Sequence, residues 1–166
     1  MLCAEHIIEH FKMQPLSDEG GWYVQTHRSA LELPQSVLPP GYPGPRTVST
    51  AILYLLTAHT CSRLHRLRSD EIFHFYLGDA VQMLQLGPAG AWCVLELGPD
   101  ILANQQCQVC VPAGTWQGAF LQDGGKFALM GCTVAPGFEF ADYEGGRRDS
   151  LLRRYPGAAE LVKRLT

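Results

Sequence analysis

Charge of one sign and long apolar runs are both missing from this sequence, and each absence excludes a class of protein. The 166 residues carry a net charge of −3, with 17% charged residues and no long block of one sign, so no surface for nucleic acid or anionic lipid is expected. No apolar run reaches transmembrane length. The start, MLCAEHIIEHFKM, lacks the basic residues and uninterrupted apolar core of a secretory signal. We therefore expect a cytoplasmic protein without nucleic-acid or membrane partners.

A second pair of closely spaced cysteines, which a four-cysteine zinc site needs, is also missing. The six cysteines include one CxxC pair, Cys107 and Cys110. The surrounding sequence QCQVCVP reads as a strand, on which residues three apart face opposite ways. We interpret this pair as ordinary packed cysteines and expect all six thiols to be reduced.

Short β-like segments dominate the chain. WYVQTHRS alternates bulky and polar residues, and from Thr47 onward such segments follow one another, separated by turn signals such as GPAG, GPD and DGG. No helical segment interrupts this series, so a parallel sheet is not expected. The later segments are TVSTAILYLLT, SRLHRL, EIFHFYL, AVQMLQL, AWCVLEL, CQVCVP, GAFLQ and KFALMGCTV. Many short strands with glycine and proline punctuation predict an all-β sandwich or barrel of the jelly-roll kind.

Helical spacing appears only at the two ends of the chain. Apolar residues recur at this spacing before Pro15, which predicts a short N-terminal helix, and again on both sides of Pro156, which predicts two short C-terminal helices. The proline-rich segment 31–46 predicts a long irregular loop. A chain of this length forms one domain by default. We therefore predict a single domain, residues 1–166, with a barrel core at about 20–143 and a helical tail at 146–165.

Several segments resemble one family in order along the chain. The segment SRLHRLRSDEIFHFYLG, residues 62–78, and the segment VPAGTWQGA, residues 111–119, resemble the first and second cupin motifs. EGGWY followed by TxRS, then STAILYLL, LGPD and GCTVAPGFEFADYE extend the resemblance to the cupins known as domain of unknown function 985, or cupin family five. The resemblance implies a double-stranded β-helix, which is the cupin jelly-roll barrel, with a pocket between its sheets, and a homodimer.

The resemblance also shows where this sequence departs from the metal-binding cupins. Leu67 stands at the second histidine of the first motif, and Gln117 stands at the histidine of the second motif. If a divalent metal ion binds, the motif positions leave His65, Glu71 and Gln117 as its ligands. Because a carboxamide oxygen is a poor ligand for zinc or iron, we expect no tightly bound metal cofactor.

A metal-independent acid/base reaction needs fewer pocket residues than a metal site does. If His65 and Glu71 share the pocket, as their motif positions imply, the carboxylate can accept a hydrogen bond from one ring nitrogen and leave the other nitrogen as a base. Arg63 lies two residues before His65 on the predicted strand, so its guanidinium can hold an anion or stabilise an enolate. This set is similar to that of the cupin-fold dTDP-4-keto-sugar epimerases, in which a histidine removes a proton and a tyrosine returns one.

Other residues are candidates for the same pocket, each with a structural alternative. Tyr54 and Tyr76 are possible proton donors, or packed aromatics. Trp116 with Gln117 can contact a ligand ring, or Trp116 can belong to the core, and Glu19 can reach the pocket or only belong to a turn. We predict His65, Glu71, Arg63 and Tyr76 as catalytic residues and Tyr54, Trp116, Gln117 and Glu19 as ligand-binding residues.

The function predicted from these residues is binding of a small polar metabolite, a sugar or nucleotide-sugar, with metal-independent epimerisation or isomerisation. Two alternatives stay open: a non-catalytic ligand-binding or storage protein, and a metal-dependent enzyme that recruits a histidine such as His27 or His59. The sequence leaves open whether His74, His27 and Asp142 face the pocket. By strand alternation, His74 should face away from Glu71.

Overall fold

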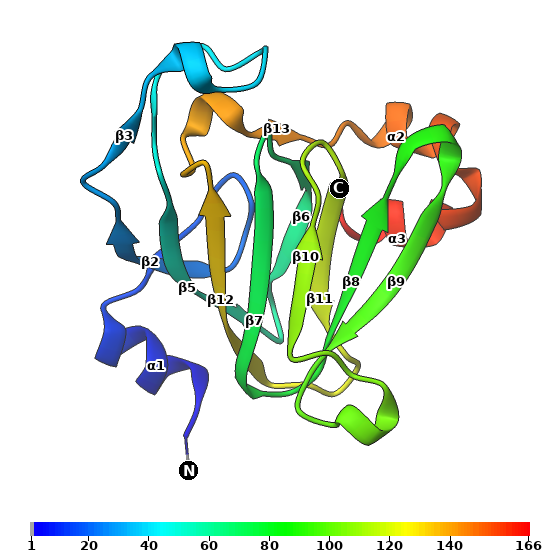
Figure 1. Ribbon diagram of the computed structural model, residues 1–166. Helices are drawn as coiled ribbons and strands as arrows, with labels where there is room; N and C mark the ends of the chain where they lie inside the picture. The colour runs from blue at the N-terminus through cyan, green and yellow to red at the C-terminus, as the bar shows by residue number, and fades with distance from the viewer. Residues whose placement is uncertain (1) are drawn as a thin grey trace.

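The computed structural model describes residues 2–166, whose main strands form two facing antiparallel sheets (Figure 1). In spatial order, the first sheet contains β1 (Gln14–Pro15), β2 (Trp22–Arg28), β5 (Thr50–Thr57), β12 (Phe127–Ala135), β7 (Asp70–Gly78) and β10 (Gln108–Val111). The second sheet contains β13 (Glu144–Gly145), β6 (Cys61–Arg66), β11 (Trp116–Leu121), β8 (Val81–Leu86) and β9 (Trp92–Leu97). This arrangement confirms the predicted all-β jelly-roll barrel.

The main core lies between the two sheets. Tyr54, Phe73 and Met83 are among its fully enclosed side chains, and they come from strands of both sheets. Removal of this apolar surface from water is the principal stabilising contribution of the barrel.

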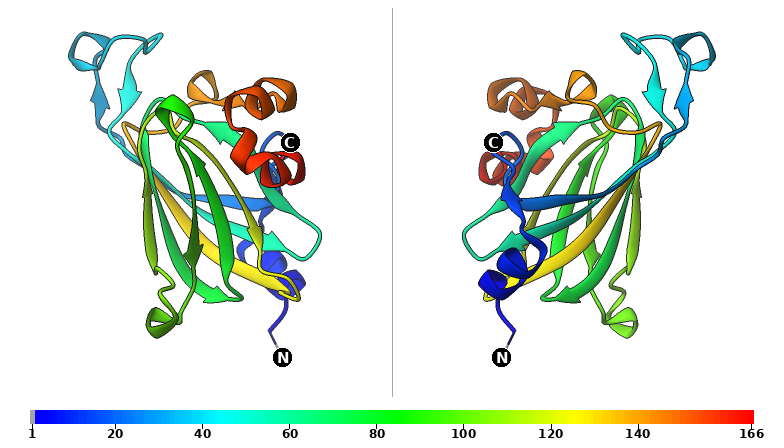
Figure 2. Two further views of the ribbon diagram at one scale, coloured as in Figure 1. Left: turned by 90° about the vertical axis from the view of Figure 1, so that its right-hand side faces the viewer. Right: turned by 90° about the vertical axis from the view of Figure 1, so that its left-hand side faces the viewer.

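The helices cover the outer faces of the sheets, as Figures 1 and 2 show. Helix α1 (Ala4–Phe11) packs Ile7 against Leu55 and Leu129 of the first sheet. Helices α2 (Arg148–Arg154) and α3 (Ala159–Arg164) pack against the second sheet and are separated by the 3-10 turn η5 (Pro156–Ala158). The expected split at Pro156 is therefore confirmed. No helix among residues 2–166 is long and apolar enough to cross a membrane.

The predicted loop at residues 31–46 projects from one end of the barrel (Figure 2). It contains η1 (Gln35–Val37) and one strand of a small two-stranded sheet, which pairs β3 (Glu32–Leu33) with β4 (Arg46–Thr47). Buried Arg46 joins this segment to Asp142, which belongs to η4 (Phe140–Asp142) on the other side of the same barrel end. The contact fixes the proline-rich segment beside the mouth of the barrel.

Two irregularities interrupt the strand pairing near the candidate site residues. In β6, three residue steps from Ser62 to His65 oppose two steps from Ala119 to Gln117 on β11, which is a β-bulge. In β7, a register shift against β12 leaves Tyr76 without a paired residue. The remaining short turns are η2 (Pro88–Gly90) and η3 (Ile101–Ala103).

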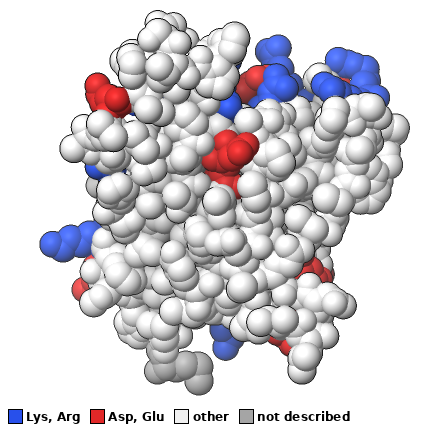
Figure 3. All heavy atoms as spheres, viewed as in Figure 1, with Lys and Arg blue, Asp and Glu red and all other residues white. Residues whose placement is uncertain are grey.

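Charged side chains are scattered over the face drawn in Figure 3. Most of this face is uncharged, and the basic side chains that gather at its upper right edge have acidic side chains beside them.

Candidate functional site

A cavity of about 180 Å³ lies at the mouth of the barrel between the sheets. Its wall combines carboxylates with aromatic and aliphatic side chains from β2, β5, β7 and β12, from the connection between β6 and β7, and from segments 16–19 and 138–143. The lining residues are Leu16, Asp18, Glu19, Tyr23, Gln25, Arg28, Thr50, Ile52, Leu67, Glu71, Cys132, Val134, Phe138, Glu139, Phe140 and Tyr143. A concave site with apolar walls and a few convergent polar groups is typical of small-molecule binding.

His65 lies beneath this cavity with only 1% of its surface exposed. Its Nδ1 is 2.7 Å from the carbonyl oxygen of Arg63. Because a carbonyl oxygen only accepts hydrogen bonds, Nδ1 must carry a proton, and Nε2 is the unprotonated nitrogen of the neutral ring. This bond joins two residues of the bulge in β6.

Gln117 connects His65 to Glu71. Its Nε2 lies 3.3 Å from Nε2 of His65 and also donates a hydrogen bond to Oε2 of Glu71. The amide thus offers one hydrogen to each acceptor, and the expected direct bond from the imidazole to Glu71 is replaced by this bridge. All three residues are buried and belong to different strands.

Glu71 is the member of this network that lines the cavity. Burial and, next, the nearby charge of Glu19 raise the pKa of its carboxyl, while His65 and the hydrogen bond from Gln117 lower it, and the net result is a rise from the usual 4.5 to about 7. A carboxyl with a pKa near 7 can both take up and release a proton at neutral pH.

Glu19, which the sequence predicts as a ligand-binding residue, lines the cavity from the segment before β2. Its Oε1 accepts a hydrogen bond of 3.1 Å from Ser62, and its Oε2 is 3.8 Å from Nε2 of His65. Two carboxylates therefore flank the buried histidine and amide.

Tyr143 and Cys132 complete the site and were not singled out from the sequence. The ring of Tyr143 stacks on the imidazole of His65, with centroids 5.2 Å apart, and burial together with Glu19 raises the pKa of its hydroxyl to about 12. Cys132 is buried in the cavity wall on β12, where burial and Glu71 hold the pKa of its thiol well above its usual value. Strand alternation with the core residue Met130 could have identified Cys132, whereas no spacing signal indicates Tyr143.

Arg63 and Tyr76, both predicted as catalytic residues, do not lie in the cavity. The bulge in β6 separates Arg63 from the inward face of His65, and its guanidinium donates instead to the carbonyl oxygens of Ser17 and Asp18 at the surface. Tyr76 is 53% exposed, because it lies an odd number of residues from Glu71 and so points to the opposite face of β7. Both predicted positions are corrected.

Tyr54 and Trp116 were predicted as ligand-binding residues, and neither lines the cavity. Tyr54 is fully buried in the barrel core, and its hydroxyl donates a hydrogen bond of 2.8 Å to the carbonyl oxygen of Gly20. Trp116 points to the opposite face of β11 from Gln117, where it packs among the C-terminal helices, with Arg66 over its ring at 4.6 Å. The structural alternative is therefore correct for both aromatic residues.

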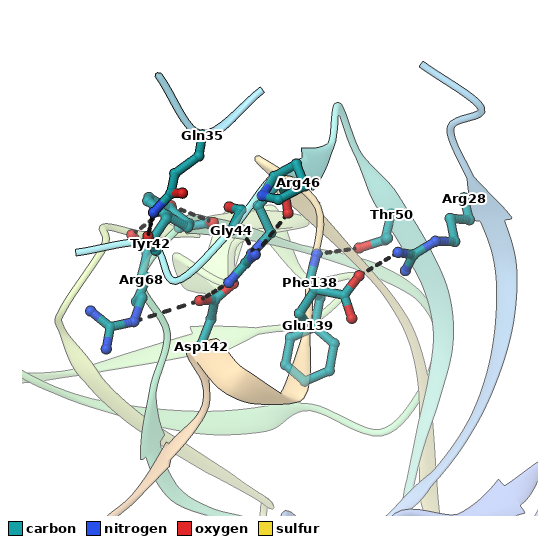
Figure 4. Close-up of polar contacts among 12 residues, drawn as sticks. Arg28, Gln35, Tyr42, Gly44, Arg46, Thr50, Arg68, Phe138, Glu139 and Asp142 are labelled. Atoms are coloured by element: carbon teal, nitrogen blue, oxygen red, sulfur yellow. Dashed lines mark hydrogen bonds and ion pairs between the residues drawn. The ribbon is translucent and has the colours of Figure 1, made fainter. Parts of the chain in front are cut away.

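The three residues whose direction the sequence left open all lie outside the cavity. His27 is exposed on β2. His74 points away from Glu71, as alternation predicts, and its ring nitrogens lie 3.1 Å from Nε2 of Gln108 and 3.3 Å from the hydroxyl of Thr133. Asp142 is buried and binds Arg46 (Figure 4); its hydrogen bond raises the pKa of that guanidinium.

The donor atoms at this site do not fit a metal ion. Within residues 2–166, no group of three or more histidine, cysteine, aspartate or glutamate side chains is arranged to hold one. The free nitrogen of His65 and one oxygen of Glu71 face the amide nitrogen of Gln117, which is a hydrogen-bond donor and not a metal ligand. The metal-dependent alternative would need this amide to turn its oxygen toward the ion or to move away.

Comparisons with known proteins agree with the fold. The sequence matches the family model described as Cupin superfamily (DUF985) over residues 5–145. Among curated proteins, none matches this chain. The chain is similar to a solved protein from Shewanella oneidensis, with 30% identity and a TM-score of 0.86, over 100% of this chain and 98% of the other.

Two further solved structures are similar to this chain, one over its whole length and one in fold alone. A protein from Leishmania major has 26% identity and a TM-score of 0.89, and the match covers 99% of each chain. Oxalate decarboxylase from Bacillus subtilis, whose structure has Mn(II) centres, has 12% identity and a TM-score of 0.53, and the match covers 94% of this chain and 38% of the decarboxylase. At that identity the decarboxylase shares the fold alone.

Proposed function

This chain belongs to the Cupin superfamily (DUF985), and from that premise we propose that it binds a small polar metabolite of the sugar class in its barrel and isomerises or epimerises it by metal-independent acid/base chemistry. The observation that carries this proposal is Glu71, a buried carboxyl in the cavity wall whose pKa is raised to about 7 by burial and by Glu19. An acid/base group works best when its pKa lies near the operating pH.

The size and charge of the cavity support a small uncharged ligand. Its volume of about 180 Å³ is below the roughly 300–1,000 Å³ of pockets for drug-sized ligands. Asp18, Glu19, Glu71 and Glu139 line it, while its one lining cation, Arg28, pairs with Glu139. An anionic group inside would meet this excess of carboxylates, so a ring or chain carrying hydroxyl groups suits the cavity better.

Each residue has a defined part in the proposed reaction. In its ionised form, Glu71 takes a proton from the carbon next to a substrate carbonyl, and the electron pair of the broken C–H bond moves into an enolate. Tyr143, protonated because its pKa is about 12, donates a hydrogen bond to the enolate oxygen. The proton on Glu71, which can exchange with solvent, then returns to carbon and restores the carboxylate. Gln117 and His65 hold the Glu71 carboxylate in place.

Deuterium exchange tests this proposal on a whole class of candidate substrates at once. The protein is incubated in D₂O with a panel of aldoses, ketoses and their phosphate esters, and NMR and mass spectrometry detect deuterium at the carbon next to the carbonyl. We expect exchange in one class of compound, and we expect Glu71→Gln to lower its rate by about 10²-fold or more. Tyr76→Phe, a change on the outer face, should leave the rate unchanged.

Two results would replace the proposal with its alternatives. Binding of a panel member by isothermal calorimetry, with no exchange in any compound, would make the protein a non-catalytic binder. Exchange that appears only after a divalent metal is added would support the metal-dependent alternative. The homodimer that the family resemblance implies stays a separate prediction, which light scattering after size-exclusion chromatography tests.

A further inference from the structure

An open groove adjoins the catalytic cavity. Its volume is about 450 Å³, and it shares the lining residues Leu67 and Tyr143 with the cavity, so the two spaces lie side by side. The remaining lining residues are Pro39, Pro40, Tyr42, Arg66, Arg68, Ala113, Gly114, Ala141, Asp142 and Glu144. The cavity has one arginine in its wall, Arg28, which pairs with Glu139, whereas the groove has two, Arg66 and Arg68.

The backbone of Arg68 is fixed at the floor of this groove. The buried side chain of Tyr42 donates its hydroxyl to the carbonyl oxygen of Arg68 at 3.1 Å and lies 2.9 Å from the hydroxyl of Ser69. The carbonyl of the preceding residue, Leu67, accepts a hydrogen bond of 2.8 Å from the backbone N–H of Gly114. Both bonds hold the connection between β6 and β7 in place.

The guanidinium of Arg68 has N–H donors that form no hydrogen bond with residues 2–166. Its Nε lies 3.5 Å from Oδ1 of Asp142, and Figure 4 shows the two terminal nitrogens directed away from that carboxylate. Its side chain is 49% exposed, and no hydrogen bond from its terminal nitrogens to any residue among 2–166 is formed. Asp142 therefore orients the guanidinium at Nε, and the two terminal nitrogens are available to a ligand.

The charges around the groove leave Arg68 in excess. Both oxygens of Asp142 already accept hydrogen bonds from Arg46, at 2.6 and 2.7 Å, and Arg66 donates to Glu144 at 2.7 and 2.8 Å. The two carboxylates of the groove wall are thus already paired, Asp142 with the buried Arg46 behind the wall and Glu144 with Arg66. The surplus positive charge lies on the exposed side chain of Arg68.

We infer that this groove binds a phosphoryl group through Arg68, so the substrate is a phosphate ester whose uncharged part occupies the cavity. A guanidinium fork matches the paired oxygens of a phosphate. The acidic cavity repels such a group, whereas the groove attracts it, which fixes the direction in which the ligand enters. This inference rests on the proposed function, because it takes the cavity as the site of the reacting part.

Phosphate binding can be measured directly, apart from any reaction. Inorganic phosphate is titrated into ¹⁵N-labelled protein, and NMR follows the backbone amide of Gly114 and the side-chain Nε–H of Arg68. We expect saturable shifts at both groups. Arg68→Gln should weaken the affinity about tenfold to hundredfold, and Arg68→Lys should restore part of it, because lysine keeps the charge but not the fork.

Lys126→Gln is the matched control. Lys126 is an exposed cation next to the first residue of β12, at the opposite end of the barrel from Arg68, and its replacement changes the net charge by the same amount. Its affinity for phosphate should equal that of the native protein. Equal losses in the two neutral variants, or shifts confined to residues outside the groove, would overturn the inference.

Three probes distinguish a sugar monophosphate from a nucleotide diphosphate as the source of the phosphoryl group: glucose, glucose 1-phosphate and UDP-glucose. Tighter binding of glucose 1-phosphate than of glucose, lost in Arg68→Gln, supports a sugar monophosphate, and the same pattern with UDP-glucose alone supports a diphosphate. Glu71→Gln separates the two proposals, because it should leave phosphate binding intact. Phosphate binding without any deuterium exchange would reject the reaction but keep the groove, whereas exchange that is insensitive to Arg68→Gln would reject the groove.

Discussion

The ring of Tyr143 stacks on the imidazole of His65, with centroids 5.2 Å apart and planes inclined by 22°. This stacking closes the histidine off from the cavity, since His65 is only 1% exposed while Tyr143 itself lines the wall. In the proposed reaction, a proton of the ligand therefore goes to Glu71, and His65 only orients that carboxylate through the amide of Gln117.

Tyr143→Phe should keep this stacking and remove only the hydroxyl. If the hydroxyl serves the reaction, kcat for the substrate found by deuterium exchange should fall by about 10²-fold, with little change in the free energy of unfolding. Steady-state kinetics and urea unfolding measure the two effects. Tyr76→Phe removes a hydroxyl from the outer face of β7 and should change neither; an unchanged kcat in Tyr143→Phe would remove Tyr143 from the mechanism.

Glu71→Gln should stabilise the protein at alkaline pH. The folded state raises the pKa of Glu71 from 4.5 to about 7, so the unfolded chain releases this proton first as the pH rises. The free energy of unfolding of the native protein then loses about 3 kcal/mol from this group between pH 4.5 and 7. Glutamine does not ionise and avoids this loss.

Urea unfolding of both proteins near pH 4 and pH 8 measures the effect. The stability of the variant relative to the native protein should increase by about 3 kcal/mol between these two pH values. A difference that is the same at both pH values would mean that Glu71 titrates as an ordinary solvated carboxyl.

Gln117→Leu should disrupt the buried network while keeping its approximate volume. It removes the donor to Nε2 of His65 and to Glu71, which leaves two buried acceptors unsatisfied at a cost of about 1–3 kcal/mol in unfolding free energy. Because the bond from Gln117 lowers the pKa of Glu71, that pKa should also rise.

The matched control is Gln85→Leu. Gln85 lies directly opposite Gln117 on β8, but its side-chain contacts are longer, at 3.4 and 3.6 Å. Chemical denaturation should show a loss below about 1 kcal/mol for this variant. Equal losses for the two glutamines would argue against a special role of the bridge.

Asp142→Ala should detach the loop at residues 31–46 from the barrel mouth. The ion pair with Arg46 is buried on both sides, and removal of the acid leaves an unpaired buried guanidinium, which costs about 3–5 kcal/mol. Thermal denaturation and limited proteolysis of the loop measure this. Glu144→Ala breaks the exposed pair with Arg66 and should cost less than about 1 kcal/mol; a similar cost for both variants would contradict the account.

The sequence predicts the strands and the central network well, because alternation and turn residues are local signals. His65, Glu71 and Gln117 lie in separate segments whose motif frames fix their positions in a barrel, and these three side chains meet as expected. Alternation also predicts correctly that His74 faces away from the pocket.

The remaining errors have three different physical causes. Arg63 was misplaced because a bulge in β6 changes the alternation, and no residue type in that segment signals a bulge. Tyr76 and Trp116 could have been excluded by strict alternation from Glu71 and Gln117. Tyr143 could not be predicted, because it reaches His65 through a segment that returns from the end of β12 and depends on long-range packing.

The most direct test of this account is the ionisation of Glu71 itself. Protein with ¹³C-labelled glutamate side chains is titrated from pH 3 to pH 10, and the Glu71 carboxyl resonance is assigned by its loss in Glu71→Gln. A titration midpoint near 7 is the predicted result, as burial and the charge of Glu19 require. A midpoint near 4.5 would show a solvated carboxylate and would contradict the proposal that this cavity performs acid/base chemistry at neutral pH.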